Sequence, residues 1–218
     1  MPNKLNNLKT ILDKIRKELC EKERIRETAQ REMHMMQSYS KQAILLVHQK
    51  REKEAATLLR KAHRIRRKLG DASATYPDII YSGLYAAALQ EYSEANIFLT
   101  LVQKDQLVTP GKINVSPTDY VLGLADVIGE YRRLALDALR VGDVEKSEGH
   151  LQTMEEMYTE LMAMDESYML IPGLRRKCDV ARKIIEITRG DITQEIRRNA
   201  LEEHLRKFEK MQKRKKQI

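Results

Sequence analysis

The sequence predicts an all-α fold, a single-domain bundle of about seven helices, from three observations. Turn-forming residues are few, with 9 Gly and 5 Pro among 218 residues. Charged residues make up 33% of the chain, whereas aromatic residues make up 5% and Trp is absent. No segment shows the alternation of apolar and polar residues that is typical of strands. Helices joined by short turns therefore account for the chain.

The helices of the first half are separated by few breakers. From Leu5 to about Leu69 the chain contains neither Gly nor Pro, which predicts one very long helix, or two with a break near residues 49–52. Gly70 is expected to end this stretch. The next helix is expected to start at Asp78, after a loop.

The second half contains the largest break, residues 104–117, after which Ser116 or Thr118 can cap a helix. Asp143 is expected to cap another helix, and Gly190 to end a later one. The expected helices span residues 119–140, 143–163, 174–189 and 192 onward. The chain is expected to form one domain over residues 1–218, with a basic helical tail at about 204–218.

Charge and cysteine usage limit the environment and the partners. The net charge of +8 and the pI of about 9.4 favour an acidic partner, which means nucleic acid or a membrane surface. Cys20 and Cys178 are far apart and lie in no CxxC motif, which indicates thiols in a reducing compartment. No signal peptide and no run of 18 apolar residues is found. We therefore expect a cytoplasmic protein that does not insert into membranes.

Two glutamates lie inside an apolar stripe of the segment 84–98. At about 100° per residue, Glu91 and Glu94 share an arc of roughly 120° with Ala87 and Phe98. An ionised carboxylate loses its hydration when it is buried, so acids on such a face need a partner. A basic side chain, a metal ion or a wet cavity can fill this role, and this segment alone favours a structural ion pair.

A second acid pair lies in the segment 117–140. Asp126 and Glu130 are four residues apart, beside Gly123 at the edge of an apolar arc. Like charges at this spacing cost a helix roughly 0.2–0.5 kcal/mol unless something offsets the repulsion. An exposed ion pair of Glu130 with Arg133 is one explanation. The other is a cation, because four carboxylates from two packed helices can bind Mg²⁺ and leave room for a phosphate oxygen.

The segment 60–68 is strongly basic. Spread around a helix, its charges cannot all pair internally, so a surface that contacts phosphates and a solvated basic face are both open. The candidate RNA-binding residues are Arg60, Lys61, Arg64, Arg66, Arg67 and Lys68.

The segments "GLYAAALQEYSEANIF" and "PTDYVLGLADVIGEYRRLALDAL", followed by "LRRKCDVARKIIEITRGDI", resemble the translin superfamily over residues 24–191. Within it, the chain is more similar to the translin-associated factor X (TRAX) type, with QE-x-x-EA on one helix and DYLLG-x-AD-x-x-GE on another. The matching acids are Glu91, Glu94, Asp126 and Glu130. Translin-type chains lack the aspartate that stands here as Asp126.

The resemblance implies that these four acids are the metal-binding and catalytic residues of an endoribonuclease that requires Mg²⁺, with Mn²⁺ as an alternative ion. It also implies a seven-helix fold that assembles into a closed, hollow octamer, inside which single-stranded RNA is held and cut. The short loop 104–117 suggests a compact prokaryotic relative that assembles with itself. Whether a translin-like partner chain is required stays open.

Three functions therefore remain. The first is a metal-dependent endoribonuclease in which water attacks the phosphodiester directly. The second is a non-catalytic assembly of the translin type that binds single-stranded nucleic acid. The third and weakest is a helical scaffold in which the acids form ordinary ion pairs. The presence of Asp126 favours the enzyme.

Overall fold

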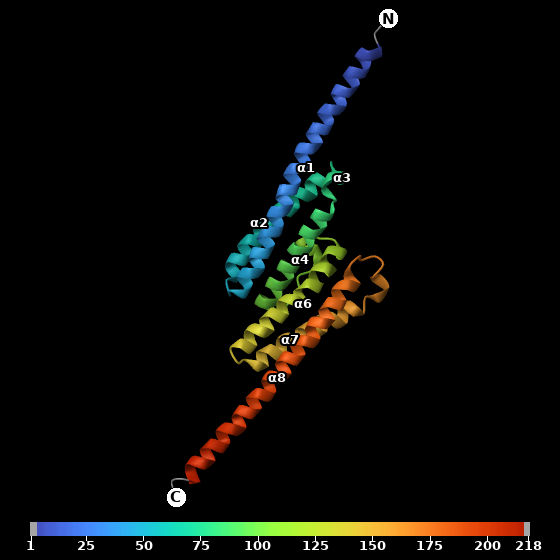
Figure 1. Ribbon diagram of the computed structural model, residues 1–218. Coiled ribbons are helices and arrows are strands. Elements are labelled where there is room, and N and C mark those ends of the chain that lie inside the picture. The colour runs from blue at the N-terminus through green and yellow to red at the C-terminus, as the bar shows by residue number, and fades with distance from the viewer. Residues whose placement is uncertain (1–3, 216–218) are drawn as a thin grey trace. The chain divides into compact units, whose positions relative to one another are not determined.

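The structure is a computed structural model that describes residues 4–215 (Figure 1). The all-α prediction is confirmed, because the described residues form eight α-helices, one 3₁₀ turn (η1) and no strand. None of the described helices combines the length and the apolar character that crossing a membrane requires. In chain order the elements are α1 (Lys4–His48), α2 (Glu52–Ser73), α3 (Pro77–Ile80), α4 (Gly83–Lys104), α5 (Pro110–Ile113), α6 (Pro117–Arg140), α7 (Val144–Met162), η1 (Asp165–Ser167) and α8 (Leu174–Lys215).

The chain divides into two compact units, the first ending at Gly123 and the second beginning at Leu124. The expected single domain stays a prediction. In the first unit α1 packs against α2, α3 and α4. Its core contains fully buried side chains from three of these helices: Met33, Met36, Leu69, Ile97 and Phe98.

Helix ends in the first unit follow from local chemistry. The predicted break near residues 49–52 is confirmed, since α1 ends at His48 and Lys50 takes a left-handed conformation with φ of 59°. Gly70 does not end α2, which continues to Ser73, because one glycine costs a helix only about 1 kcal/mol and Leu69 anchors this turn in the core. The helix expected from Asp78 is instead the single turn α3, and α4 starts later.

The second unit contains the rest of α6, then α7, η1 and α8, with α7 packed against α8. Asp143 caps α7 as predicted, because its carboxylate accepts the Lys146 N–H at 3.1 Å. The prediction that Gly190 ends a helix is wrong, since α8 runs through it without interruption. Thr188 and Ile192, on either side of this glycine, are both buried and hold the helix in place.

Gly123 brings the start of α6 into close contact with α4. A methyl group at this position would lie 2.7 Å from the Ser93 Cβ and 2.8 Å from both the Gln90 carbonyl oxygen and the Glu94 backbone nitrogen. Real Cβ atoms do not approach other atoms so closely, and two of these three atoms belong to helix backbone. Only glycine therefore permits this spacing. Ser116, just before α6, fixes the helix start by accepting the Asp119 N–H at 3.0 Å.

Replacing Gly123 with alanine should destabilise the protein by about 1–3 kcal/mol, because the added methyl group forces the two helices apart. Gly129→Ala on the same helix is the control, since a methyl group there meets no atom within 4 Å. It should leave stability unchanged or raise it by up to about 1 kcal/mol. Urea denaturation of both variants tests this. Equal unfolding midpoints would show that the contact at Gly123 is not tight.

Candidate functional site

The two acids on α4 differ in their burial and in their partners. Glu94 is buried, with 9% of its surface exposed. The Glu91 side chain is 26% exposed, and its Oε1 lies 3.2 Å from the Nζ of Lys41 on α1. Packing of α4 against α1 brings this lysine to the glutamate. Glu94 thus lies on the buried face of α4, and Glu91 lies at its edge.

The acids on α6 are half-buried, and one of them has a close basic partner. Lys177, in the first turn of α8, donates to both carboxylate oxygens of Asp126 at 2.5 Å. Glu130 lies one turn further along the helix. At about 100° per residue, Asp126 and Glu130 fall within roughly 60° of Gly123, on one side of α6. Gly123, which contacts α4, therefore lies on the same face of α6 as Asp126 and Glu130.

The acids have the chemistry of ligands for a hard cation, which takes carboxylate oxygens. Within residues 4–215, no group of three or more His, Cys, Asp and Glu side chains is arranged to hold a metal ion. Each acid pair instead includes a carboxylate bonded to a lysine, Glu91 to Lys41 and Asp126 to Lys177. The oxygens that these ammonium groups contact are of the kind that Mg²⁺ takes as ligands.

The basic segment predicted to bind RNA lies on α2, and five of its six candidates share one face. At about 100° per residue these five fall within roughly 120° of the helix. Lys68 forms an ion pair with Glu32, and Lys61 lies over the ring of Tyr39 at 5.7 Å. The exposed members are Arg60, Lys61, Arg64, Arg67 and Lys68.

Arg66 differs from these five, because it lies on the core side of α2 and is 8% exposed. Its Nη1 donates to the carbonyl oxygen of Asn114 at 2.8 Å. Nearby, the Nδ1 of His63 lies 3.0 Å from the hydroxyl of Tyr92 on α4. Burial raises the pKa of Tyr92 to about 12. Burial, helped by Arg66 and Arg67, lowers the pKa of His63, so two neutral side chains join α2 to α4.

These features define a helical protein with acid pairs on two helices and a basic face on a third. The model of the Translin family matches residues 8–187, so the chain belongs to the Translin family. A similar protein is the uncharacterized MJ0175 of Methanocaldococcus jannaschii. The two are 32% identical over 186 residues, which cover 78% of this chain and 82% of that protein.

Solved structures of C3PO proteins share the fold. The structure of AfC3PO with duplex RNA is 34% identical, with a TM-score of 0.74, and the match covers 84% of this chain and 95% of that one. The crystal structure of AfC3PO gives a TM-score of 0.73 at the same identity, over 84% and 96% of the chains. The crystal structure of apo-NeC3PO is 22% identical and shows the fold alone, with a TM-score of 0.75. The match covers 89% of this chain and 98% of that one. The translin-like fold is thereby confirmed.

The depressed pKa of His63 should make folding weaken as the pH falls. Below the ordinary imidazole pKa of about 6.5, the unfolded chain takes up a proton that the folded chain resists, so protons favour unfolding. The unfolding free energy of the wild type should therefore fall more steeply between pH 7 and pH 5 than that of His63→Gln. Urea titrations measure this. His34→Gln, at an exposed histidine of α1, is the control and should follow the wild type. If the unfolding free energies of the wild type and His63→Gln fell equally with pH, the lowered pKa of His63 would be contradicted.

Proposed function

We propose that this chain is a TRAX-type, Mg²⁺-dependent endoribonuclease that cuts single-stranded RNA inside a hollow homo-oligomer, an octamer. The observation that carries the proposal is that a Translin-family chain holds all four acids of the TRAX-type pattern, Asp126 included. The likeness to AfC3PO, whose structure was solved with duplex RNA, supports RNA as the ligand.

In this proposal Glu91, Glu94, Asp126 and Glu130 hold the cation, Mg²⁺ or alternatively Mn²⁺. The bound ion supplies a Lewis acid that activates a water and stabilises charge on the phosphate. The contact at Gly123 sets where α6 starts against α4, the helix that carries Glu91 and Glu94. Lys41 and Lys177 balance the carboxylate charge before a cation binds, which offsets the repulsion that four acids would otherwise generate.

The exposed basic face of α2 is proposed to hold the RNA backbone. Its three arginines, Arg60, Arg64 and Arg67, present guanidinium groups that bind phosphate without regard to sequence. Arg66 is left out of this role because it is buried and bonded to Asn114. Self-assembly closes the chamber in this proposal, and a translin-like partner chain is the alternative composition.

One structural observation favours the second candidate, an assembly that binds single-stranded nucleic acid without cutting it. The carboxylates of Glu91 and Asp126 are each bonded to a lysine, as structural ion pairs would be. In that case the acids hold helices together and no cation takes part. The two functions differ in whether the wild type cuts RNA with Mg²⁺, and in whether any cleavage depends on Asp126.

Replacing Asp126 with asparagine should lower Mg²⁺-dependent cleavage of a labelled single-stranded RNA by about 100-fold or more, because a ligand charge is lost. EDTA should abolish cleavage by the wild type. The matched control is Asp137→Asn, at a half-buried acid of the same helix that pairs with Arg140 at 3.6 Å. It should cut as the wild type does.

A stability measurement completes this comparison. Asp126→Asn and Lys177→Gln break the same ion pair, which is partly exposed, so each should lower the unfolding free energy by no more than about 1 kcal/mol. If Asp126→Asn cuts RNA as well as the wild type, Asp126 is structural and its catalytic assignment is wrong. If the wild type binds RNA without cutting it in the presence of Mg²⁺, the binding assembly is the better reading.

Replacing Arg60, Arg64 and Arg67 together with glutamine should weaken binding of single-stranded RNA and flatten its salt dependence. Each phosphate contact that is lost should reduce the slope of log affinity against log salt by roughly 0.7. Fluorescence anisotropy at several salt concentrations measures this with two RNA sequences. An unchanged slope would show that this face of α2 is only solvated.

A further inference from the structure

One apolar seam runs along α1, and only its C-terminal part is covered. Residues spaced alternately three and four apart share one side of a helix and pack against a neighbouring helix. In α1 this spacing connects six fully or nearly fully buried residues that pack in the first unit: Ala29, Met33, Met36, Ser40, Ala43 and Val47. The covered seam thus follows a regular heptad pattern.

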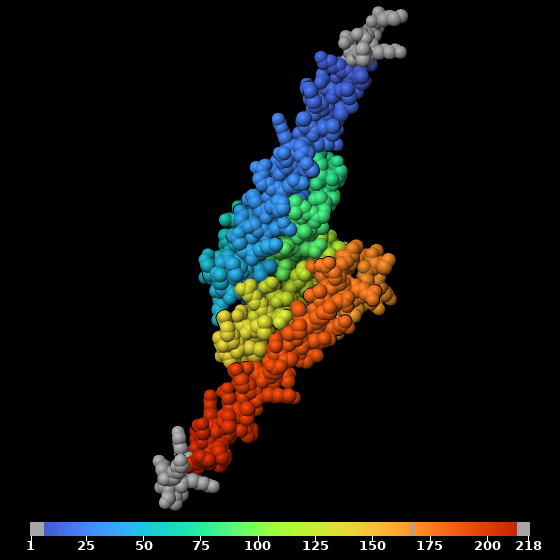
Figure 2. Space-filling model, in the orientation of Figure 1, coloured from blue at the N-terminus to red at the C-terminus, as the bar shows by residue number. Residues whose placement is uncertain are grey.

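The same spacing continues toward the N-terminus without a change of register. Arg26 and Lys22 come next, and then four apolar residues that are 45–60% exposed: Leu19, Ile15, Leu12 and Leu8. On the face seen in Figure 2, no other helix of the first unit covers these turns of α1. The helix therefore presents two heptads of packing surface to solvent.

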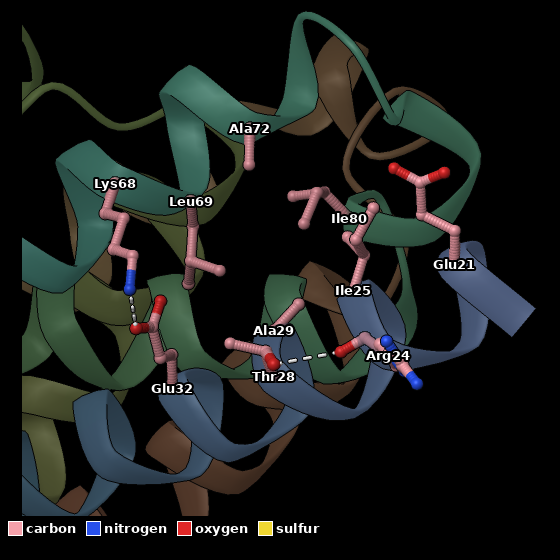
Figure 3. Close-up of a pocket in the computed structure, with 10 residues that line it drawn as sticks. All are labelled: Glu21, Arg24, Ile25, Thr28, Ala29, Glu32, Lys68, Leu69, Ala72 and Ile80. Carbon is pink, nitrogen blue, oxygen red and sulfur yellow. Dashed lines mark hydrogen bonds and ion pairs between the residues drawn. The ribbon is translucent and has the colours of Figure 1, made fainter.

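A pocket of about 290 Å³ lies where the covered part of the seam begins (Figure 3). Ile25 and Ala29 of α1 line it together with Leu69 of α2 and Ile80 of α3. Charged residues, among them Glu21, line it as well. On the N-terminal side of this pocket no described helix of the first unit packs on the seam, whereas on its C-terminal side α2 and α3 already cover it. A further helix that covers the exposed part must therefore end near the pocket.

We propose that the exposed seam of α1, from Leu8 to Leu19, is an interface that binds the same segment of a second copy of this chain in antiparallel orientation. In a parallel pair, the second α1 would continue along the seam past Arg26 into the space that α2 and α4 occupy. The antiparallel orientation avoids this conflict.

The length of the exposed seam fixes the register. Pairing Leu8 with Leu19 of the second copy, and Leu12 with Ile15, gives four layers that are apolar on both sides. Because α1 begins at Lys4, the second helix in this register begins level with Glu23 of the first and runs from there toward Leu8, away from Ala29. The segment therefore fits a copy of itself, and the contact is two-fold symmetric. This inference depends neither on a metal ion nor on RNA cleavage.

Disulfide trapping tests both the contact and its orientation. Cys20 is exposed and is first changed to serine, whereas the buried Cys178 stays. Leu8→Cys and Leu19→Cys are then made in separate full-length chains, which are mixed, allowed to exchange and oxidised. In the antiparallel pair the two introduced thiols meet, while identical positions of the two copies are about 16 Å apart along the axis. A cross-linked dimer is expected from the mixture and not from either variant alone.

Three results would overturn the proposal. The first is that the mixture gives no cross-linked dimer. The second is that each single variant alone gives as much dimer as the mixture, which indicates a parallel pair. The third is that Leu8→Cys mixed with Lys17→Cys gives as much dimer as Leu8→Cys mixed with Leu19→Cys. Lys17 is exposed and lies on the opposite side of α1 from the seam.

A second variant tests whether apolar packing drives the contact. Leu12→Glu, added to both cysteine chains, should lower the yield of the cross-link about tenfold or more, because a charge would be buried between leucines. Leu107→Glu is the control, since Leu107 is 53% exposed and Leu12 is 54% exposed. Far-ultraviolet circular dichroism checks that both variants remain helical. The proposal would be contradicted if both substitutions lowered the cross-link yield equally, or if neither lowered it.

Discussion

The contact between Gly123 and α4 sets how closely two helices of the first unit approach. The two helix backbones approach so closely there that position 123 admits no side chain. The acids of each helix lie near this contact along the helix. Glu94 contributes one of the backbone atoms at the contact, and Asp126 and Glu130 follow on the same side of α6 as the glycine. The glycine is thus a geometric requirement of the contact between these two helices.

Much of the fold could be read from local sequence, because a long chain without Gly or Pro has few alternatives to helix. The cap at Asp143 was predictable because an aspartate can accept a backbone N–H at the start of a helix, whereas the break after His48 was only one of two alternatives. Gly70 and Gly190 were misread as helix ends, since a glycine weakens a helix locally whereas its neighbours in the core decide whether the helix continues. Tertiary packing outweighs propensity at both sites.

The acids of the candidate site could be named from spacing and resemblance, but their partners could not. Lys177 lies 51 residues from Asp126, and Lys41 lies 50 residues before Glu91, so no helical spacing links them. Arg66 was grouped with the surface arginines because it belongs to the same basic run. Its burial depends on which side of α2 faces the core, and the apolar residues Leu59, Ala62 and Leu69 on that side carry the only signal for it.

The bond between Arg66 and the Asn114 carbonyl differs in kind from the lysine–carboxylate pairs. A guanidinium stays protonated at any pH that a protein meets, and a backbone carbonyl does not titrate. The segment that leads into α6 is thus held to α2 by a buried hydrogen bond that involves no carboxylate.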